Sequence, residues 1–227
     1  MSTGDAAMFD VVERWARAEP DRVALEFDEH RWTYAEFAER VRRAATALRD
    51  CGVEPGDRFA VLDQDHPACL ELIFAASLIG TSCAVVDGGA GREEITGVLG
   101  ESGCGVVAVG EDFVDLLDEL IDDLPLVRDV IVLGEDYEAR LLAVDPITDP
   151  HEPDADERVL LLHPAGSAGH AETPRGLARV ETAAADEPNV VSAPLCDPAG
   201  AGRALGGLRA GARTVVVRQR AALPVDR

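Results

Sequence analysis

Lysine is absent from the 227 residues, so all 21 basic residues are arginine. This absence excludes mechanisms that need a lysine amine, such as Schiff-base formation or an ammonium contact with phosphate. Basic residues are also few beside the 43 acidic ones, which leaves a formal net charge of −22. Because affinity for nucleic acids and anionic membranes comes mainly from basic side chains, we expect neither as a partner.

Cysteines are few, and no two of them form a C-x-x-C pair (Cys51, Cys69, Cys83, Cys104 and Cys196). This spacing argues against a disulfide framework or a zinc site and favours a reducing compartment. Long hydrophobic runs are also missing, since the longest uncharged stretch, Leu72–Val86, is too short to span a bilayer. Residues 1–18 lack a cationic start followed by an apolar run, so no signal peptide is predicted. We therefore expect a soluble cytoplasmic protein.

What is present is enough apolar sequence, 47% of the residues, for a buried core. A capping box of Thr33 and Glu36 begins the clearest helix, and Gly52 follows its end. Short apolar strands then alternate with helices. The strands are expected at 59–62, 82–86, 106–109 and 130–133, and the helices at 67–79, 92–99 and 112–121. This alternation predicts an α/β fold with a parallel-rich sheet and helices on both faces.

The ends of this region carry further predicted elements. A helix is expected over 9–18, followed by a hairpin of strands 23–27 and 31–33. Asp65 is placed to cap the helix over 67–79, in which Glu71 is the only charge. A helix that is apolar on every side must be buried on every side, so we expect it to lie between the sheet and another layer.

An acidic, proline-rich stretch then interrupts the alternation of strands and helices, with six carboxylates and three prolines in residues 145–157. It lacks the glycine and the terminal glutamate of a calcium-binding loop, so a solvated linker is favoured. We predict an N-terminal α/β lobe over 1–150, an acidic linker over 151–158 and a second α/β lobe over 159–227. Within the second lobe, strands are expected at 159–163, 190–193 and 214–218, and a helix at 199–210.

One loop, residues 164–176, could carry chemistry. It follows a buried strand and is rich in glycine and small residues, and such loops bring backbone N–H groups close to phosphate oxygens. Gly166, Ser167 and Gly169 supply the permissive backbone and one hydroxyl, and Arg175 supplies a cation. The loop matches neither a Walker motif nor a dinucleotide fingerprint, and a plain turn remains the alternative.

Several segments in order resemble the adenylate-forming superfamily of acyl-CoA synthetases and peptide-synthetase adenylation domains. They are P-D-R-V-A-L ending at Leu25, W-T-Y-A-E-F at 32–37, G-V-x-P-G-D-R at 52–58, L-E-L-I-F-A at 70–75 and E-D-F at 111–113. The resemblance implies the N-terminal portion of that fold, and with it activation of a carboxylic acid with ATP and magnesium.

The family's phosphate loop, T-S-G-T-T-G-x-P-K-G, is degenerate here. Residues 166–169 fall on G-T-T-G, and residues 174–176, including Arg175 and Gly176, fall on P-K-G. Pro164 and Ala165 replace Thr-Ser, Ala168 lacks a hydroxyl, and three extra residues separate the two halves. The resemblance thus places a weakened nucleotide phosphate site at Gly166, Ser167, Gly169, Arg175 and Gly176.

The family's substrate-pocket segment, P-L-F-H, appears as residues 194–197, so Cys196 and Asp197 take the pocket positions of the aromatic residue and the histidine. The sequence given also ends before the family's adenine-binding segment, its ribose-binding aspartate and the C-terminal domain with its catalytic lysine. The resemblance therefore implies shared ancestry more firmly than activity.

Three hypotheses follow. The first is a truncated, non-catalytic family member without catalytic or metal-binding residues, acting as a binding or partner subunit. Its partner would be another protein or a second copy that covers apolar surface left by the cut sheet and the helix 67–79, and an acyl group, ATP or AMP with Mg²⁺ would be its ligands if nucleotide binding is retained. The alternative is an active ATP-dependent acyl-adenylating ligase, and a further alternative is a folded remnant without a selected activity.

Overall fold

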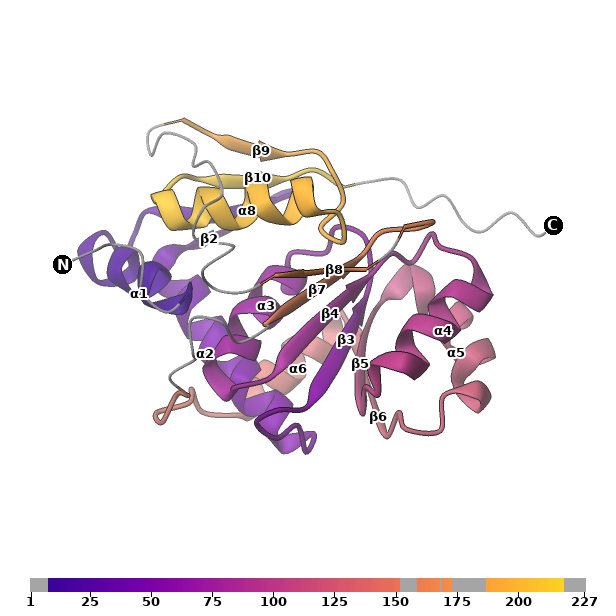
Figure 1. Cartoon of the computed structure of the whole chain (residues 1–227). Helices are drawn as coiled ribbons and strands as arrows, with labels where there is room; N and C mark the ends of the chain where they lie inside the picture. Colours follow the sequence, from indigo (N-terminus) through magenta and orange to yellow (C-terminus); the bar gives the residue numbers. More distant parts are fainter. Residues whose placement is uncertain (1–7, 152–158, 168, 173–186, 219–227) are drawn as a thin grey trace.

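The computed structural model describes residues 8–151, 159–167, 169–172 and 187–218. Its strands form one six-stranded and one four-stranded sheet, with helices packed around both (Figure 1). The fold is therefore α/β, as the alternation of apolar strands and helices predicts.

The six-stranded sheet has the order β6-β5-β3-β4-β7-β8. Its members are β3 (Arg58–Leu62), β4 (Ser82–Val86), β5 (Val106–Gly110), β6 (Asp129–Leu133), β7 (Leu160–His163) and β8 (His170–Glu172). All neighbours are parallel except β7 and β8, which pair antiparallel. The short β8 lies inside the segment that the sequence predicts as a loop, because three residues of small and polar type give no periodic signal.

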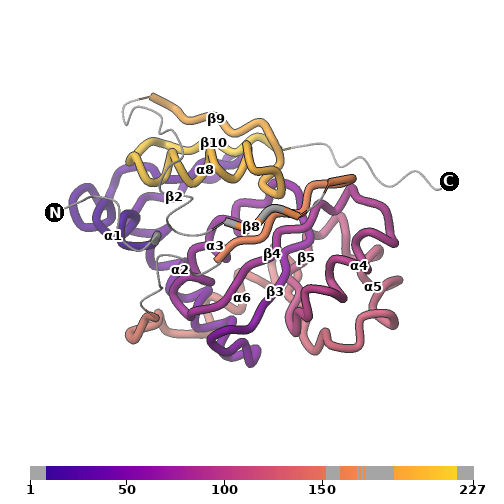
Figure 2. The backbone as a smooth tube through the Cα atoms, in the orientation of Figure 1, coloured from indigo at the N-terminus to yellow at the C-terminus, as the bar shows by residue number. Residues whose placement is uncertain are grey.

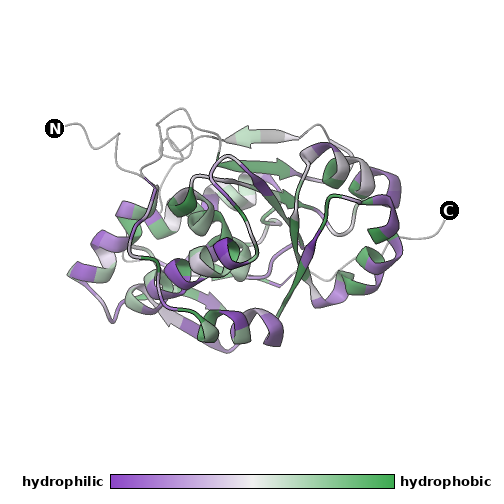
Figure 3. Cartoon of the chain, turned by 90° about the horizontal axis from the view of Figure 1, so that it is seen from below, coloured by the Kyte–Doolittle hydropathy of each residue, from purple (hydrophilic) through white to green (hydrophobic). Residues whose placement is uncertain are grey.

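Helices cover both faces of this sheet (Figure 1). On one face lie α2 (Tyr34–Asp50), α3 (Ala68–Ile79) and α6 (Glu135–Ala143), and on the other lie α4 (Arg92–Ser102) and α5 (Val114–Leu120), the latter flanked by the short 3-10 helices Glu111–Phe113 and Ile121–Asp123. Alternate residues of β3 face opposite ways: Phe59 and Val61 belong to the core on the α3 side, whereas Ala60 and Leu62 belong to the core on the α4 side. Along the surrounding helices, green and purple residues alternate, as one buried face requires (Figure 3).

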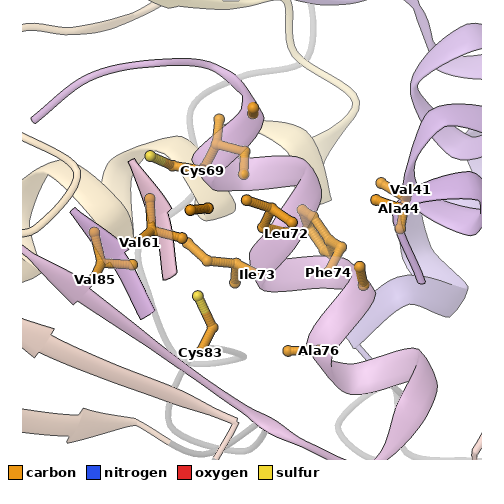
Figure 4. Packing of buried hydrophobic residues seen from close by; sticks show 14 of the residues in the cluster. Val41, Ala44, Val61, Cys69, Leu72, Ile73, Phe74, Ala76, Cys83 and Val85 are labelled. Atoms are coloured by element: carbon orange, nitrogen blue, oxygen red, sulfur yellow. The ribbon is translucent and has the colours of Figure 1, made fainter. Parts of the chain in front are cut away.

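Helix α3 confirms the prediction of a helix buried on every side, since all its residues are buried. Ile73 points toward Val61 of the sheet, whereas Phe74 points toward Val41 and Ala44 of α2 (Figure 4). The expectation that this helix offers apolar surface to a partner is wrong, because the chain itself covers it.

Helix α2 begins at the predicted capping box. The Thr33 hydroxyl accepts from the Glu36 N–H at 3.2 Å, and the Glu36 carboxylate accepts from the Thr33 N–H at 2.8 Å. Helix α6 has no counterpart in the sequence prediction, although its buried Tyr137 and Leu141 are spaced one turn apart.

The four-stranded sheet joins the two ends of the described chain. Its order is β2-β1-β10-β9, with β1 (Val23–Phe27), β2 (His30–Thr33), β9 (Asn189–Val191) and β10 (Thr214–Val216). The predicted hairpin β1–β2 is confirmed, and β10 pairs in parallel with both β1 and β9. Helices α1 (Met8–Ala18) and α8 (Pro198–Ala210) accompany this sheet, so late residues lie beside early ones (Figure 2).

Strands from both sides of the acidic segment 151–158 thus share both sheets, because β7 pairs with β4 and β10 pairs with β1. Of that segment only His151 lies within the described residues, and its N–H donates to the Leu78 carbonyl at 2.7 Å. The division into two lobes remains a prediction about folding units.

Candidate functional site

The carboxyl ends of β3, β4, β5 and β7 meet at one edge of the six-stranded sheet, because these strands are parallel. In open α/β sheets, ligands bind at this edge. A carboxylate follows directly after three of these strands: Asp63 after β3, Asp87 after β4 and Glu111 after β5. The candidate site is built around these loops and the loop after β7.

Asp63 shapes the loop that leads from β3 into α3. One of its carboxylate oxygens, Oδ1, accepts from the N–H groups of Asp65 at 2.8 Å and His66 at 2.7 Å. The predicted cap by Asp65 is therefore wrong, since Asp63 holds these N–H groups and Pro67 occupies the N-cap without a side-chain bond. The first N–H of the helix, that of Ala68, donates instead to His66 Nδ1 at 3.2 Å.

Asp87 connects the loops that follow three different strands. Its Oδ1 accepts from Gln64 Nε2 and from the Gly89 N–H, both at 2.8 Å, and its Oδ2 accepts from the Ala165 N–H at 3.4 Å. The Gln64 carbonyl in turn accepts from the Leu195 N–H at 2.7 Å, which attaches the segment before α8. The Asp87 carboxylate therefore holds the loops after β3, β4 and β7 together at the edge of the sheet.

The predicted phosphate loop is folded into a tight turn over residues 164–167. The Pro164 carbonyl accepts from the Ser167 N–H at 3.3 Å and from the Ser167 hydroxyl at 3.1 Å. Gly166 has a φ of 70°, the left-handed region that glycine adopts without strain. Its N–H donates to Glu94 Oε1, in the first turn of α4, at 2.8 Å. Two N–H groups of the loop, at positions 165 and 166, thus donate to carboxylates of the same chain.

His163, the last residue of β7, lies beneath this loop. A Cβ atom at Gly169 would lie 2.4 Å from the His163 ring, so a larger residue there would require the ring to shift. The ring Nε2 is buried and has no hydrogen-bond partner within the described residues. Burial lowers the pKa of His163 below its usual value, and the Glu94 carboxylate opposes this shift only in part.

The two predicted pocket positions serve the fold. Cys196 is 0% exposed, and burial together with the Asp87 charge raises the pKa of its thiol far above the ordinary value. Asp197 is the N-cap of α8, where its carboxylate accepts from the Ala199 N–H at 2.7 Å. A buried neutral thiol and a capping carboxylate are both committed to local structure. The other two predicted site residues, Arg175 and Gly176, lie outside the described residues.

A cleft of about 120 Å³ opens along the same edge, between the loops after β3 and β5. The charged and titratable residues of its lining are Asp63, Asp65, His66, Glu111, Asp112 and Arg218. Arg218 lies over the Phe27 ring and donates from Nε and Nη2 to Asp28 at 3.1 and 2.9 Å. With carboxylates in the majority, the cleft disfavours an anion.

The sequence reasoning missed Asp63, Asp87, Glu94 and Arg218. A signal existed for the first two, because each is a carboxylate that directly follows a buried parallel strand. Glu94 gives no such signal, since it looks like an ordinary acid in the first turn of a helix.

Two kinds of feature are absent from the described residues: a cluster of metal ligands and a membrane-spanning helix. Within the described part of the chain, no group of three or more His, Cys, Asp or Glu side chains is arranged to hold a metal ion. No helix among the described residues is long and apolar enough to cross a membrane.

Comparison with known proteins shows which family and which relatives this chain is similar to. The model of the family described as AMP-binding enzyme matches residues 12–225. The chain is 28% identical over 180 residues to 3-oxocholest-4-en-26-oate–CoA ligase of Rhodococcus rhodochrous. This match covers 74% of this chain and 32% of that protein. It is 39% identical over 94 residues to feruloyl-CoA synthase of an Amycolatopsis species, covering 41% of this chain and 19% of that protein. The chain thus spans about a third or less of the length of these relatives.

A solved structure agrees on the fold. The long-chain fatty-acid–CoA ligase of Archaeoglobus fulgidus matches with a TM-score of 0.85 at 14% identity, covering 96% of this chain and 48% of that one. At this identity the likeness concerns the fold alone.

Proposed function

Since the chain belongs to the AMP-binding enzyme family, we propose that it is a member that does not adenylate a carboxylic acid and that acts as a binding or partner subunit. The observation that carries the proposal is the state of the loop after β7. Its Ala165 and Gly166 N–H groups, which would face a phosphate, donate to Asp87 and Glu94. A nucleotide phosphate at this place would meet two carboxylates instead of two donors.

The composition of the loop supports the same proposal. The resemblance puts Pro164 and Ala165 where the family has two hydroxyl side chains, and it puts an arginine, Arg175, where the family has a lysine. An arginine fork is a poor geometric replacement for a compact ammonium group. Loss of one preorganised contact of this kind typically costs about 10²–10³ in rate, so several together leave little catalysis.

The pocket positions add a second line of support. Cys196 is fully buried and Asp197 caps α8, so neither side chain is available to an acyl substrate or to proton transfer. The two carboxylates on the loop N–H groups argue against a phosphate there, and no reaction step through ATP or Mg²⁺ follows from the described residues. Binding of ATP, AMP or an acyl group therefore remains a proposal for experiment.

A partner protein or a second copy is the other part of the proposal. Buried α3 does not supply the interface, and large exposed apolar side chains among the described residues are scattered (Leu126, Leu142, Val190 and Val217). Size-exclusion chromatography with light scattering decides whether the purified chain forms a homo-oligomer. A strict monomer without a copurifying protein would contradict this part of the proposal.

The catalytic part is tested by ATP–pyrophosphate exchange with a panel of aliphatic, aromatic and amino acids. We expect no exchange above background from the folded wild-type chain. Exchange that Arg175→Ala abolishes would overturn the proposal and establish the alternative, an active ligase. The Arg17→Ala variant is the matched control, because it removes one arginine whose side chain is 76% exposed and pairs with Glu13 of the same helix, α1.

A further inference from the structure

We infer that the Glu94 carboxylate is a built-in anion that occupies the loop after β7 and lowers its affinity for phosphate. The inference rests on the proposed function and names the residue that enforces it. The Gly166 N–H points at Glu94 Oε1 at 2.8 Å, the distance and donor type of a charge-assisted hydrogen bond. A carboxylate oxygen thus takes the position that a phosphate oxygen would need.

The geometry around Gly166 is that of an open anion-binding turn. Its φ of 70° is left-handed, and among the described residues no atom beyond its two chain neighbours lies within 4 Å of the position of a Cβ atom. Successive N–H groups in such turns form concave sites for anions. Ala165 contributes a second N–H on the same turn, so the loop has kept its donors although it has lost hydroxyl side chains.

Glu94 differs from Asp87 in how firmly it is held. Asp87 also accepts from Gln64 and Gly89 at 2.8 Å, so it is fixed by the loops that it joins. For the Glu94 carboxylate, the bond to Gly166 is the only hydrogen bond within the described part of the chain, and the side chain is half-buried. Glu94 is therefore the carboxylate that can be removed without dismantling the edge of the sheet.

Two effects oppose a phosphate while Glu94 is in place. The N–H of Gly166 is engaged, and a negative charge stands where the ligand's negative charge would come. A ligand's apparent affinity is proportional to the fraction of molecules in which its site is open. Removing the Glu94 carboxylate, which competes for the site, therefore raises the affinity for phosphate. We expect a gain of about 10- to 100-fold for an inorganic anion, the range of one charge-assisted contact.

The test is isothermal titration of inorganic pyrophosphate and of AMP at fixed ionic strength into wild type, Glu94→Ala, Glu94→Gln and Glu93→Ala. Glu93 is the matched control, because it is the exposed neighbour on the same helical turn and its removal changes the net charge equally. We expect the tightest binding for Glu94→Ala and intermediate binding for Glu94→Gln, whose amide oxygen still accepts from Gly166. Glu93→Ala should bind like wild type. Equal affinities for Glu94→Ala and wild type, or an equal gain for Glu93→Ala, would overturn the inference.

A second readout follows the Gly166 amide by ¹⁵N NMR. We expect its proton resonance to move upfield in Glu94→Gln, where a neutral acceptor replaces a charged one, and to move back when pyrophosphate is added. An unchanged Gly166 resonance in Glu94→Gln contradicts the inference even if Glu94→Ala fails to fold. ATP–pyrophosphate exchange by the wild-type chain would contradict the proposed function, whereas unchanged pyrophosphate binding in Glu94→Ala would contradict the inference about Glu94. The two failures are therefore distinguishable.

Discussion

The hydroxyl of Tyr34 donates to the carbonyl of Leu208 at 2.8 Å across 174 residues of sequence, and it lies 3.3 Å from the carbonyl of Ala212. Tyr34 is the first residue of α2, and Leu208 lies in the last turn of α8. Carbonyls at a helix C-terminus need partners from outside the helix, and the Leu208 carbonyl has two, the Tyr34 hydroxyl and the Gly211 N–H at 3.3 Å. The same buried hydroxyl thus joins the first residue of α2 to the last turn of α8.

Tyr34→Phe should lower the free energy of unfolding by about 0.5–1.5 kcal/mol, because the Leu208 carbonyl loses the shorter of its two hydrogen bonds and keeps the one from Gly211. Urea denaturation followed by circular dichroism measures the change. Tyr137→Phe is the comparison: its hydroxyl donates to the buried Glu71 carboxylate at 2.8 Å, and a hydrogen bond to a charged group is worth about 1.5–3 kcal/mol, so its loss should be larger. A loss in Tyr34→Phe that equals or exceeds the loss in Tyr137→Phe would contradict this account.

Glu71→Ala should cost about 3–5 kcal/mol, since it removes the buried partner of an arginine. Glu71 is 1% exposed, and its Oε1 accepts from Arg40 Nε at 2.6 Å. Glu138 contacts the same guanidinium at 2.6 Å, yet its side chain is 47% exposed. Glu138→Ala should therefore cost only about 1 kcal/mol or less. Thermal and urea unfolding of both variants measure the contrast, and equal losses would refute it.

Gly110→Ala should destabilise the chain by about 1–3 kcal/mol through steric crowding. A Cβ atom there would lie 1.9 Å from Asp63 Oδ2, and Asp63 cannot swing away without releasing the N–H groups of Asp65 and His66. Gly97→Ala is the control, because that helical position has open space around it. It should stabilise by about 0.5–1 kcal/mol, the difference in helix propensity. A neutral Gly110→Ala would show that Asp63 is mobile.

His163 should make stability fall on acidification. Burial lowers its pKa in the folded state, so the unfolded chain binds more protons between that lowered pKa and the unfolded value of about 6.5. The contribution of His163 to the free energy of unfolding is therefore fully present above about pH 6.5, and it is lost as the pH falls toward the lowered pKa. Urea unfolding at pH 7.5, 6.5 and 5.5 should show a smaller decrease for His163→Gln than for wild type. Identical slopes would contradict the assignment.

Local patterns predicted much of the fold. The capping box at Thr33 and the apolar surface of α3 act within one or two turns of chain, so neighbouring residues alone determine them. The parallel sheet followed from the alternation of short apolar strands with helices. Helix α6 was missed because only Tyr137 and Leu141 mark its buried side, and two residues are a weak periodic signal.

The contacts of the candidate site were less predictable, because they join residues far apart in sequence. Nothing near Gly166 indicates that its N–H meets Glu94, which lies 72 residues earlier and on another element. Asp197 was placed by resemblance in a substrate pocket, but the proline that follows it makes it an N-cap in its own right. A motif comparison identifies ancestry, and only the folded chain shows which donors are already used.

The insertion of β10 between β1 and β9 has a consequence for biosynthesis. The ribosome makes β1 well before β10, so one edge of β1 has no partner while the residues between them are translated. An unpaired strand edge invites pairing with other nascent chains. A cell that expresses this protein must shield that edge until Thr214 emerges and closes the gap.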